Sequence, residues 1–378
     1  MKTSYSQNNT YTKCPKHWHW SYIERWEPLL KGASTYFGSA VDEGVEALLM
    51  GKSDYLKIFR DRWDTAEAFG TRTKIFDNHE VIFAHNDFDG DILAQVDFNQ
   101  LNLWGQELGL IPVGTQLVNE DLVALFKRIS KDKQNPYKGI SANELAFFNR
   151  AGWISMKCKG ELLIEAFKTQ FMPRIKKVLA TQQYAKIQDQ TTGDIVSGFI
   201  DMVLEIDGYS LPIIFDLKTA GRPYDQEQIE LTSQLTLYSA MKGTFSNDPQ
   251  KFSTDLVGYI VLCKNIKKDV IANCKSCGYQ KQSQHKTCNN TINGLRCSGE
   301  WLEKKVPKPE VQVLIEKKSP EQIQAMLNDV ANIIVAMKNL IIYKNTDMCN
   351  NWYGGKCPFY GACHKNDFTG LKKKERSK

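Results

Sequence analysis

The fold is decided by residues 195–218, which read IVSGFIDMVLEIDGYSLPIIFDLK. Apolar residues dominate both ends of this stretch, and Asp207-Gly208 lies between them. An Asp-Gly pair between two apolar runs is a strong hairpin signal. The pattern therefore predicts two antiparallel strands that place Asp201 beside Asp216.

Further elements are predicted on both sides of this hairpin from apolar periodicity, turn residues and helix caps. Strands are expected at residues 185–188, 195–206, 211–218, 255–263 and 311–315. Helices are expected at 39–49, from Ser141, from Gly160 to about Ala180, at 226–241 and from Ser319, with 54–180 largely helical. This order predicts an α/β fold, which we expect to be one domain over residues 1–378.

The composition is that of an ordinary globular protein. The 378 residues are 42% hydrophobic and 24% charged, and the net charge of +6 permits a nucleic-acid partner without requiring one. The start, MKTSYSQNNTYTK, lacks an apolar signal core, and no stretch approaches the roughly 20 apolar residues of a membrane span. We therefore expect a soluble cytoplasmic protein. The basic tail, 366–378, is expected to be solvated and disordered, with phosphate contact as the alternative.

The hairpin carries residues suited to phosphodiester cleavage. Asp216 and Lys218 are two residues apart on one strand, so their side chains point to the same face. Asp201 and Asp216 are predicted ligands of Mg²⁺ or Mn²⁺, with the backbone carbonyl of Leu217 as a third. Lys218 would orient the attacking water or neutralise the phosphoryl oxygens.

Three short motifs in one order strengthen this interpretation. They are G-x-x-D at 198–201, D-x-K at 216–218 and Q-x-x-x-Y at 234–238. In this order and spacing the chain resembles the RecB-like branch of the PD-(D/E)XK nuclease superfamily. The resemblance implies a restriction-endonuclease-like central mixed sheet flanked by helices. It also implies that Gln234 and Tyr238 line the active site and contact Lys218 or DNA.

The chain departs from the family at its first motif. The family pattern is G-x-x-x-H, whose histidine binds metal, whereas this sequence has Gly38-Ser39-Ala40-Val41-Asp42. Aspartate is a good oxygen ligand for Mg²⁺, so Asp42 is the predicted ligand at this position. The alternative is that Asp42 is an exposed helix charge.

Four of the ten cysteines lie near the ends of the chain, and no secretion signal suggests disulfides. Cys349, Cys357 and Cys363, within 345–365, leave a metal site one ligand short, and Cys14 is the candidate fourth. Four thiolates suit zinc and iron–sulfur clusters equally. The arrangement resembles RecB-like nucleases of the CRISPR-adaptation and AddB types, which implies a [4Fe–4S] cluster that ties the two ends together.

A second cysteine group lies in the segment 270–303. The Cys-x-x-Cys-Gly turn that begins it is typical of a zinc ribbon and predicts a structural Zn²⁺ bound by Cys274, Cys277, Cys288 and Cys297. His285 could replace Cys288 as a ligand. Whether this insert contacts DNA or only stabilises a loop stays open at this point, although it carries Lys275, Lys281, Lys286 and Arg296.

The leading hypothesis is a Mg²⁺- or Mn²⁺-dependent DNA nuclease, and specifically an exonuclease acting on ends or single strands in replication, recombination or repair. A helicase or recombinase partner and a bacterial or phage-infected cytosol would fit this activity by analogy. The alternative is a DNA-binding protein of the same fold whose catalytic centre has decayed, a reading that rests on Asp42.

Overall fold

The computed structural model describes a defined part of the chain. The described residues are 1–64, 74–76, 79–83, 98–110, 112–113, 141–241, 254–281, 287–288, 290–350 and 356–374. Much of the predicted helical region 54–140, together with His285, Lys286 and the last four residues of the tail, lies outside them.

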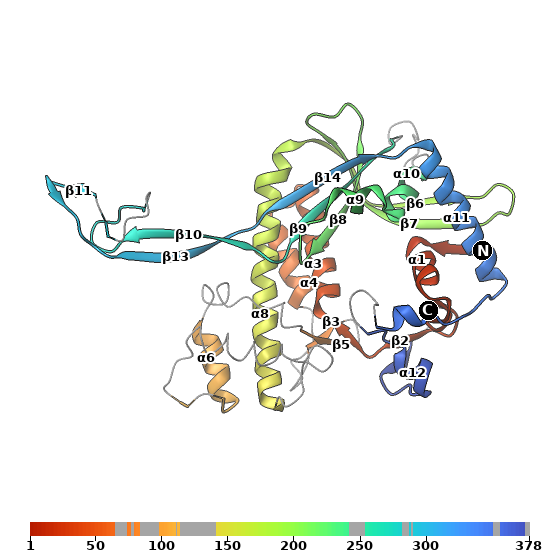
Figure 1. Cartoon of the computed structure of the whole chain (residues 1–378), viewed down its shortest axis with the longest axis horizontal. Coiled ribbons are helices and arrows are strands. Elements are labelled where there is room, and N and C mark those ends of the chain that lie inside the picture. Colours follow the sequence, from red (N-terminus) through yellow and green to blue (C-terminus); the bar gives the residue numbers. More distant parts are fainter. Residues whose placement is uncertain are drawn as a thin grey trace.

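Within these residues, six strands form a mixed central sheet (Figure 1). The strand order is β1-β7-β8-β9-β14, and β6 also pairs with β7. The β1/β7 and β8/β9 pairs are parallel, and the others are antiparallel. The strands are β1 (Lys2–Ser4), β6 (Ile175–Gln188), β7 (Ile195–Ile206), β8 (Ile213–Ala220), β9 (Leu256–Cys263) and β14 (Val311–Lys317).

Helices cover both faces of the sheet, as an α/β core requires. Phe215 and Leu217 of β8 pack into a cluster with α3 (Ala33–Leu49), α4 (Tyr55–Asp64) and α8 (Ala142–Ala166). The neighbouring Ile214 packs on the other face against α9 (Gln226–Glu230), α10 (Ser233–Ala240) and α11 (Pro320–Lys338). Because side chains alternate along a strand, Asp216 and Lys218 lie on the α10 side.

The predicted hairpin is confirmed. Met202 pairs with Phe215, and the register continues through Val203–Ile214. Asp201 and Asp216 therefore occupy facing positions one step beyond the last paired residues. The predicted strands at 255–263 and 311–315 are confirmed as β9 and β14, and Ser319 caps α11 as expected.

The prediction of two helices from Ser141 and from Gly160 to about Ala180 was wrong. α8 is one helix from Ala142 to Ala166, capped by Ser141, and it passes through Gly160. Gly160 marks a close approach, because a Cβ there would lie 2.1 Å from the Phe59 ring. The helix then widens into a π-helical turn (Phe167–Phe171) and ends in a tighter 3-10 turn that contains Pro173, and the chain enters β6 at Ile175.

The region 54–180 is also less helical than expected, because it includes two short strands. β4 (Lys74–Phe76) and β5 (His79–Ile82) pair with each other, and β5 also pairs with β3 (Leu30–Gly32). Between α4 and α8 the structure also describes helix α6 (Phe98–Glu107), which contacts α8. The strands are three and four residues long, too short for an alternation pattern to predict.

The helix predicted over residues 226–241 is two helices. α9 ends at Glu230, and α10 begins at Ser233 after an extended Thr232. The buried Lys318 explains the break, because its Nζ donates to the carbonyls of Ile229 and Glu230 at 2.7 Å each. These carbonyls at the end of α9 would otherwise lack partners.

The C-terminal tail is not wholly disordered, contrary to the prediction for 366–378. β15 (Leu371–Lys373) pairs with β2 (Trp26–Pro28), and the Lys373 ammonium donates to the carbonyl of Glu24 at 2.7 Å. A partner strand about 345 residues away cannot be read from local sequence, which is why the pairing was missed. In the described part of the chain, no helix combines the length and apolar character of a membrane span.

The insert predicted at 270–303 is longer than expected and forms an arm (Figure 1). Two strands, β10 (Lys267–Cys274) and β13 (Trp301–Lys308), pair over eight positions and carry the short hairpin β11 (Thr291–Ile292) and β12 (Leu295–Arg296) at the far end. We call residues 267–308 the arm.

Candidate functional site

Three acidic side chains from three different elements meet beside Lys218. Asp42 comes from the middle of α3, Asp201 from β7 and Asp216 from β8. They act on one another electrostatically: the charge of Asp216 raises the pKa values of Asp42 and Asp201. We call Asp42, Asp201, Asp216 and Lys218 the carboxylate pocket.

Asp216 is the most enclosed of the three, with 2% of its surface exposed. Its Oδ2 lies 2.5 Å from the Lys218 ammonium, and its Oδ1 accepts a hydrogen bond from Gln234 Nε2 at 2.7 Å. Burial raises the pKa of Asp216 more than Lys218 lowers it. Burial alone would lower the pKa of Lys218, but Asp216 and Asp201 outweigh it and raise that pKa, so the lysine stays charged.

Asp201 is held where the ladder between β7 and β8 ends. Its Oδ2 accepts the backbone N–H of Leu217 at 2.8 Å. Burial, followed by the charges of Asp216 and Asp42, raises the pKa of Asp201 well above its usual range. The carboxylate therefore takes the place of a strand–strand hydrogen bond and keeps the Leu217 backbone beside the pocket.

Asp42 is not an exposed helix charge. Burial first, and then the neighbouring Asp216 and Glu46, raise its pKa to about 6. Its Oδ2 accepts a hydrogen bond from Gln182 Nε2 at 2.8 Å. The structure therefore brings the residue at the histidine position of the resembling motif into the same pocket as Asp201 and Asp216.

Gln182 is a residue of this pocket that the sequence did not indicate. It lies in β6 with φ of 44°, between the pairs Thr181–Met202 and Gln183–Ile200, and so across from Asp201. A left-handed backbone in a residue other than glycine costs on the order of 1–3 kcal/mol and is concentrated at functional sites. Nothing in the local sequence marks it.

Gln234 and Tyr238 extend the pocket from α10. They are four residues apart, so both face the sheet. Gln234 Nε2 also donates to the Tyr238 hydroxyl at 3.1 Å, and Gln234 Oε1 accepts from Lys218 Nζ at 3.3 Å. The Tyr238 hydroxyl donates to the carbonyl of Phe199 at 2.8 Å. The amide of Gln234 thus orients Asp216 and Lys218 together.

Gly198 and Tyr238 are coupled by close packing. A Cβ at position 198 would lie 3.0 Å from the Tyr238 ring. The glycine of the G-x-x-D motif is therefore explained by space for the tyrosine of the Q-x-x-x-Y motif. Tyr259 of β9 lies on the other side, with Lys218 Nζ 5.9 Å from its ring centre, and is a second neighbour that the sequence did not indicate.

The pocket fits a hard divalent cation. Among the described residues, Lys218 is the one cation that acts on the pKa values of all three aspartates, so their ionised form leaves negative charge uncompensated. In addition, Asp216 Oδ2 is buried and has no hydrogen bond of acceptable geometry, its contact with Lys218 being an ion pair alone. Carboxylate oxygens are the ligands that Mg²⁺ and Mn²⁺ prefer.

The four cysteines of the arm lie together at its far end. Sγ atoms of Cys274 and Cys297 are 3.6 Å apart, as are those of Cys277 and Cys288. In the part of the chain that the structure describes, they are the one group of three or more Cys, His, Asp or Glu whose ligand atoms all lie within 4.8 Å. A tetrahedral ion with metal–sulfur bonds of about 2.3 Å places its sulfurs about 3.8 Å apart. These residues could therefore bind a metal.

Backbone amides support thiolates in this group. The amides of Ser276 and Gly299 donate to Cys274 Sγ and Cys297 Sγ at 3.4 and 3.5 Å. Burial raises the pKa of Cys274, but the amides of Ser276 and Cys277 and the neighbouring thiols outweigh it and lower the pKa to about 6. A thiol that ionises readily is a good metal ligand.

The four cysteines from the chain ends also converge. Cys14, Cys349, Cys357 and Cys363 line one small cavity together with Trp20 and Phe359. Asn345 Nδ2 donates to the carbonyl of Lys13 at 2.9 Å, and Lys16 donates its backbone N–H to Tyr343 at 3.0 Å, so the two ends of the chain are tied here. We call this group the terminal cysteines.

Two histidines that were not predicted to belong to this site lie beside the terminal cysteines. His17 Nδ1 is 3.6 Å from Cys357 Sγ, and His364 Nε2 is 3.3 Å from Cys349 Sγ. Burial, followed by Lys13, lowers the pKa of His17 to about 3, which keeps its ring neutral. The sequence did offer a signal, because His17 follows Cys14 at a Cys-x-x-His spacing and His364 directly follows Cys363.

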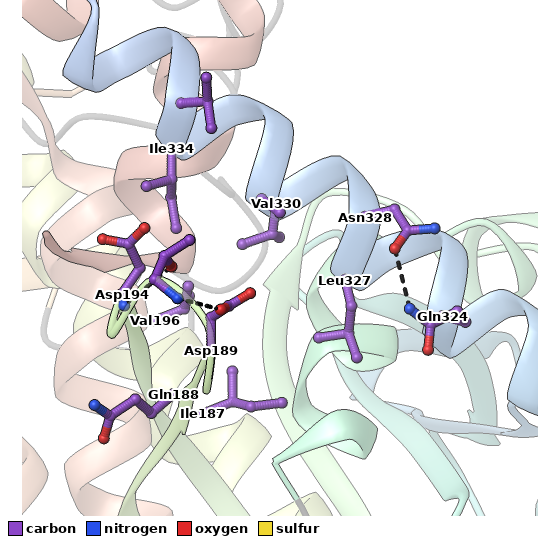
Figure 2. A pocket seen from close by; sticks show the side chains of 13 residues that line it. Ile187, Gln188, Asp189, Asp194, Val196, Gln324, Leu327, Asn328, Val330 and Ile334 are labelled. Carbon is purple, nitrogen blue, oxygen red and sulfur yellow. Dashed lines mark hydrogen bonds between the residues drawn. The ribbon is translucent and has the colours of Figure 1, made fainter.

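A large groove lies elsewhere on the molecule. It encloses about 260 Å³ between α11 and the β6–β7 hairpin, and Leu327, Val330 and Ile334 line it (Figure 2). Its acidic residues are already engaged: Asp194 accepts from Lys338 at 2.7 Å, and Asp189 accepts the amide of Thr191 at 2.8 Å. The converging polar groups lie at the carboxylate pocket, which we therefore take as the candidate site despite the larger groove.

Comparison with known proteins adds little. No family model matches the chain. No curated protein matches it. Among solved structures, the chain is similar to the one described as "Crystal structure of SSO0001", with 10% identity over 65% of this chain and 86% of that chain and a TM-score of 0.24.

Proposed function

We propose that the chain is a divalent-metal-dependent DNA nuclease of the RecB-like PD-(D/E)XK type, with a restriction-endonuclease-like core. The observation that carries this proposal is the carboxylate pocket, in which α3, β7 and β8 bring three mutually repelling carboxyl groups to one lysine. Such an arrangement is costly for a fold unless a cation relieves it.

Each residue of the pocket has a role in this proposal. Asp42, Asp201, Asp216 and the Leu217 carbonyl would hold Mg²⁺ or Mn²⁺. When bound, the cation supplies a water that is nucleophilic at neutral pH and neutralises charge on the phosphate. Lys218, protonated throughout, donates hydrogen bonds to the attacking water or to a non-bridging phosphate oxygen. Gln234 keeps Asp216 and Lys218 in their relative positions, and Tyr238 fixes the β7 backbone at Phe199.

The test is cleavage of end-labelled single- and double-stranded DNA with Mg²⁺ or Mn²⁺. Asp201→Asn and Lys218→Ala should each lose roughly 10²-fold or more in rate, because charge stabilisation at the reacting phosphate is removed. Asp207→Asn is the matched control, since Asp207 lies in the exposed turn of the same hairpin. Wild-type rates in both pocket variants, or no cleavage by the wild-type chain, would overturn the proposal. Release of mononucleotides from an end would identify the exonuclease that we favour.

The second candidate is a DNA-binding protein whose catalytic centre has decayed. It is favoured by one observation, the aspartate at position 42 where the resembling motif has histidine. The substitution Asp42→His, which restores the histidine of the resembling motif, distinguishes an active nuclease from a decayed one. A gain of cleavage in a chain that otherwise binds DNA without turnover would support decay, whereas cleavage by the wild-type chain refutes it.

For the cysteine groups we propose Zn²⁺ in the arm and a [4Fe–4S] cluster at the terminal cysteines. The arm sulfurs have the spacing of a single tetrahedral ion, whereas the ligand atoms of the terminal cysteines do not all lie within 4.8 Å of one another, a wider spacing that suits a cluster better than a single ion. The purified protein should be brown and contain four iron and one zinc. Cys14→Ser should lose the colour and the iron but keep the zinc. A colourless wild-type protein with two zinc ions would overturn the cluster assignment.

A further inference from the structure

The arm projects away from the body of the protein and has no hydrophobic core of its own (Figure 1). Eight antiparallel pairs join β10 and β13, from Lys267–Lys308 at the base to Cys274–Trp301 near the tip. At about 3.3 Å per residue, this ribbon extends roughly 25 Å beyond its base. Because so long a projection does not contribute to the packing of the domain, we ask which partner it could bind.

The positive charge of the protein is concentrated in the arm. Residues 267–308 contain nine Lys and Arg against three Asp and Glu, a net charge of +6, which equals that of the whole chain. The rest of the chain is therefore neutral overall. A Zn²⁺ held by four thiolates would carry −2 and would leave the arm at +4. A projection with a net positive charge on a neutral body is the electrostatic signature of a nucleic-acid contact.

The arrangement of side chains supports nucleic acid over protein. Lys267 and Lys308 face each other across the two strands, but each already has a carboxylate partner, Glu310 at 2.7 Å and Asp269 at 3.1 Å respectively. The charge of the arm therefore favours nucleic acid through its net excess of basic residues and not through this pair.

Val270 and Leu302 are 58% and 59% exposed but lie on opposite faces of the ribbon. Ile292 and Leu295, 45% and 77% exposed, pair with each other at the tip, so the exposed apolar residues described in the arm do not form one continuous apolar patch along it. Protein interfaces are built on such patches.

The base of the arm lies at the same end of the sheet as the carboxylate pocket. β8 and β9 are parallel, and Lys218 is in register with Val261. β9 ends two residues later, at Cys263, and the arm begins at Lys267. The backbone of Lys264 also donates to the carbonyl of Ala220, at the end of β8, at 2.7 Å. A DNA strand that leaves the carboxylate pocket can therefore run outward along the arm.

We infer that the arm binds the phosphate backbone of the DNA along its length, out to about seven or eight nucleotides from the point of cleavage. This distance rests on the proposed function, because it takes the carboxylate pocket as that point. It follows from a reach of roughly 25 Å and a phosphate spacing of about 3.4 Å along one strand. The contact is electrostatic, so it is independent of base sequence.

The test is a variant that lowers the charge of the arm and keeps its fold. Lys275→Gln, Lys305→Gln and Lys308→Gln are combined, since these side chains are exposed and lie at the tip, middle and base. The control combines Lys57→Gln, Lys176→Gln and Lys317→Gln, which remove the same charge from exposed sites on α4, β6 and β14. One zinc per chain in both variants verifies that the arm is intact.

Binding is measured by fluorescence anisotropy on a labelled 30-nucleotide strand and a 30-base-pair duplex, without added Mg²⁺ or Mn²⁺, over a range of NaCl concentrations. Each lost phosphate contact lowers the slope of log K against log salt by about 0.7 on single strands and 0.9 on duplex. The arm variant should therefore lose about two units of slope and roughly tenfold in affinity, while the control keeps the wild-type slope.

An arm variant with the wild-type slope on both substrates would overturn the inference and direct attention to a protein partner. The outcome is separable from that of the proposed function. Arm-dependent DNA binding without cleavage refutes the nuclease and leaves the arm contact standing. Normal cleavage with an unchanged salt slope refutes the arm contact alone.

Discussion

The carboxylate pocket and the tip of the arm are both candidate metal sites, but the fold prepares them in opposite ways. The pocket lies on a six-stranded sheet whose residues pack on both faces, so the scaffold holds the ligands in place before any cation arrives. The described residues of the arm form a two-stranded ribbon, β10 and β13, with the short β11–β12 hairpin at its tip and no hydrophobic core, and such ribbons are at best marginally stable in water. If both sites bind metal as proposed, the protein positions the metal in the pocket, whereas in the arm the metal stabilises the protein.

This difference separates an exchangeable cation from a structural one. In the pocket, mutual repulsion of three carboxylates opposes folding and is relieved by a cation, so the cation can leave without loss of the fold. In the arm, the free energy of metal binding is itself folding free energy, on the order of 10–16 kcal/mol for structural zinc. Loss of metal should therefore have a large local effect in the arm and a small one in the pocket.

The largest expected effect is that of Cys277→Ser. Zinc should be lost, and amide protection over Lys267–Lys308 should fall by at least about 10²-fold, because the ribbon has no other source of stability. Amides of β7 and β8 should keep their protection. Hydrogen exchange with mass spectrometry measures both, and Ser298→Ala, beside Cys297, is the control. An arm that stays protected without zinc would remove the contrast between the two sites.

The next effect is that of Asp42→Asn on the metal-free protein. A pKa raised to about 6 means that the ionised carboxylate opposes folding at neutral pH. The amide should stabilise the metal-free chain by about 2–3 kcal/mol at pH 7.5 and should lose most of the stabilisation by Mn²⁺. Thermal unfolding with and without Mn²⁺ measures this. Glu43→Gln, one residue along α3 and 45% exposed, should change little. A less stable Asp42→Asn protein would contradict the repulsion argument.

A smaller effect is the pH dependence of cation binding. The folded pKa of Asp42, about 6, lies above that of the unfolded chain, so its contribution to metal-free stability is largest at acid pH and is lost as the pH rises through 6. Cation binding must displace that proton, so Mn²⁺ affinity should rise with pH up to and through 6, by up to about tenfold per unit for each ligand carboxyl group that is still protonated. Calorimetric titration at pH 5 to 8 tests this. A flat profile would show that Asp42 is not a ligand.

The smallest effect is that of Tyr238→Phe. It removes a hydroxyl that donates to the Phe199 carbonyl and accepts from Gln234. A stability loss of about 1–2 kcal/mol is expected from the two lost hydrogen bonds, with a several-fold decrease in cleavage rate. Tyr184→Phe, at a tyrosine that is 47% exposed on β6, is the control. A larger loss in the control would place the effect outside the pocket.

The sequence predicted what depends on local patterns. The hairpin at Asp207-Gly208, the facing positions of Asp201 and Asp216, and the Ser319 cap all follow from short stretches of chain, and the structure contains them. The helix predicted to run to about Ala180 ends at Ala166, and Pro173 was a sequence signal that a helix could not continue that far. Gln182 could not have been predicted, because its left-handed backbone is imposed by the surrounding strands. The β2–β15 pairing depends on contacts between distant parts of the chain, which local periodicity does not encode.

The contact of Gly198 with the Tyr238 ring has a consequence for how such chains diverge. A change at either position strains the other: a larger residue at 198 requires the tyrosine ring to shift, and a smaller residue at 238 leaves a void and an unanchored β7 backbone. The two should therefore covary across descendants of this chain, with substitutions at 198 found only beside a reduced side chain at 238. Two motifs that are 40 residues apart would then be inherited as a single unit.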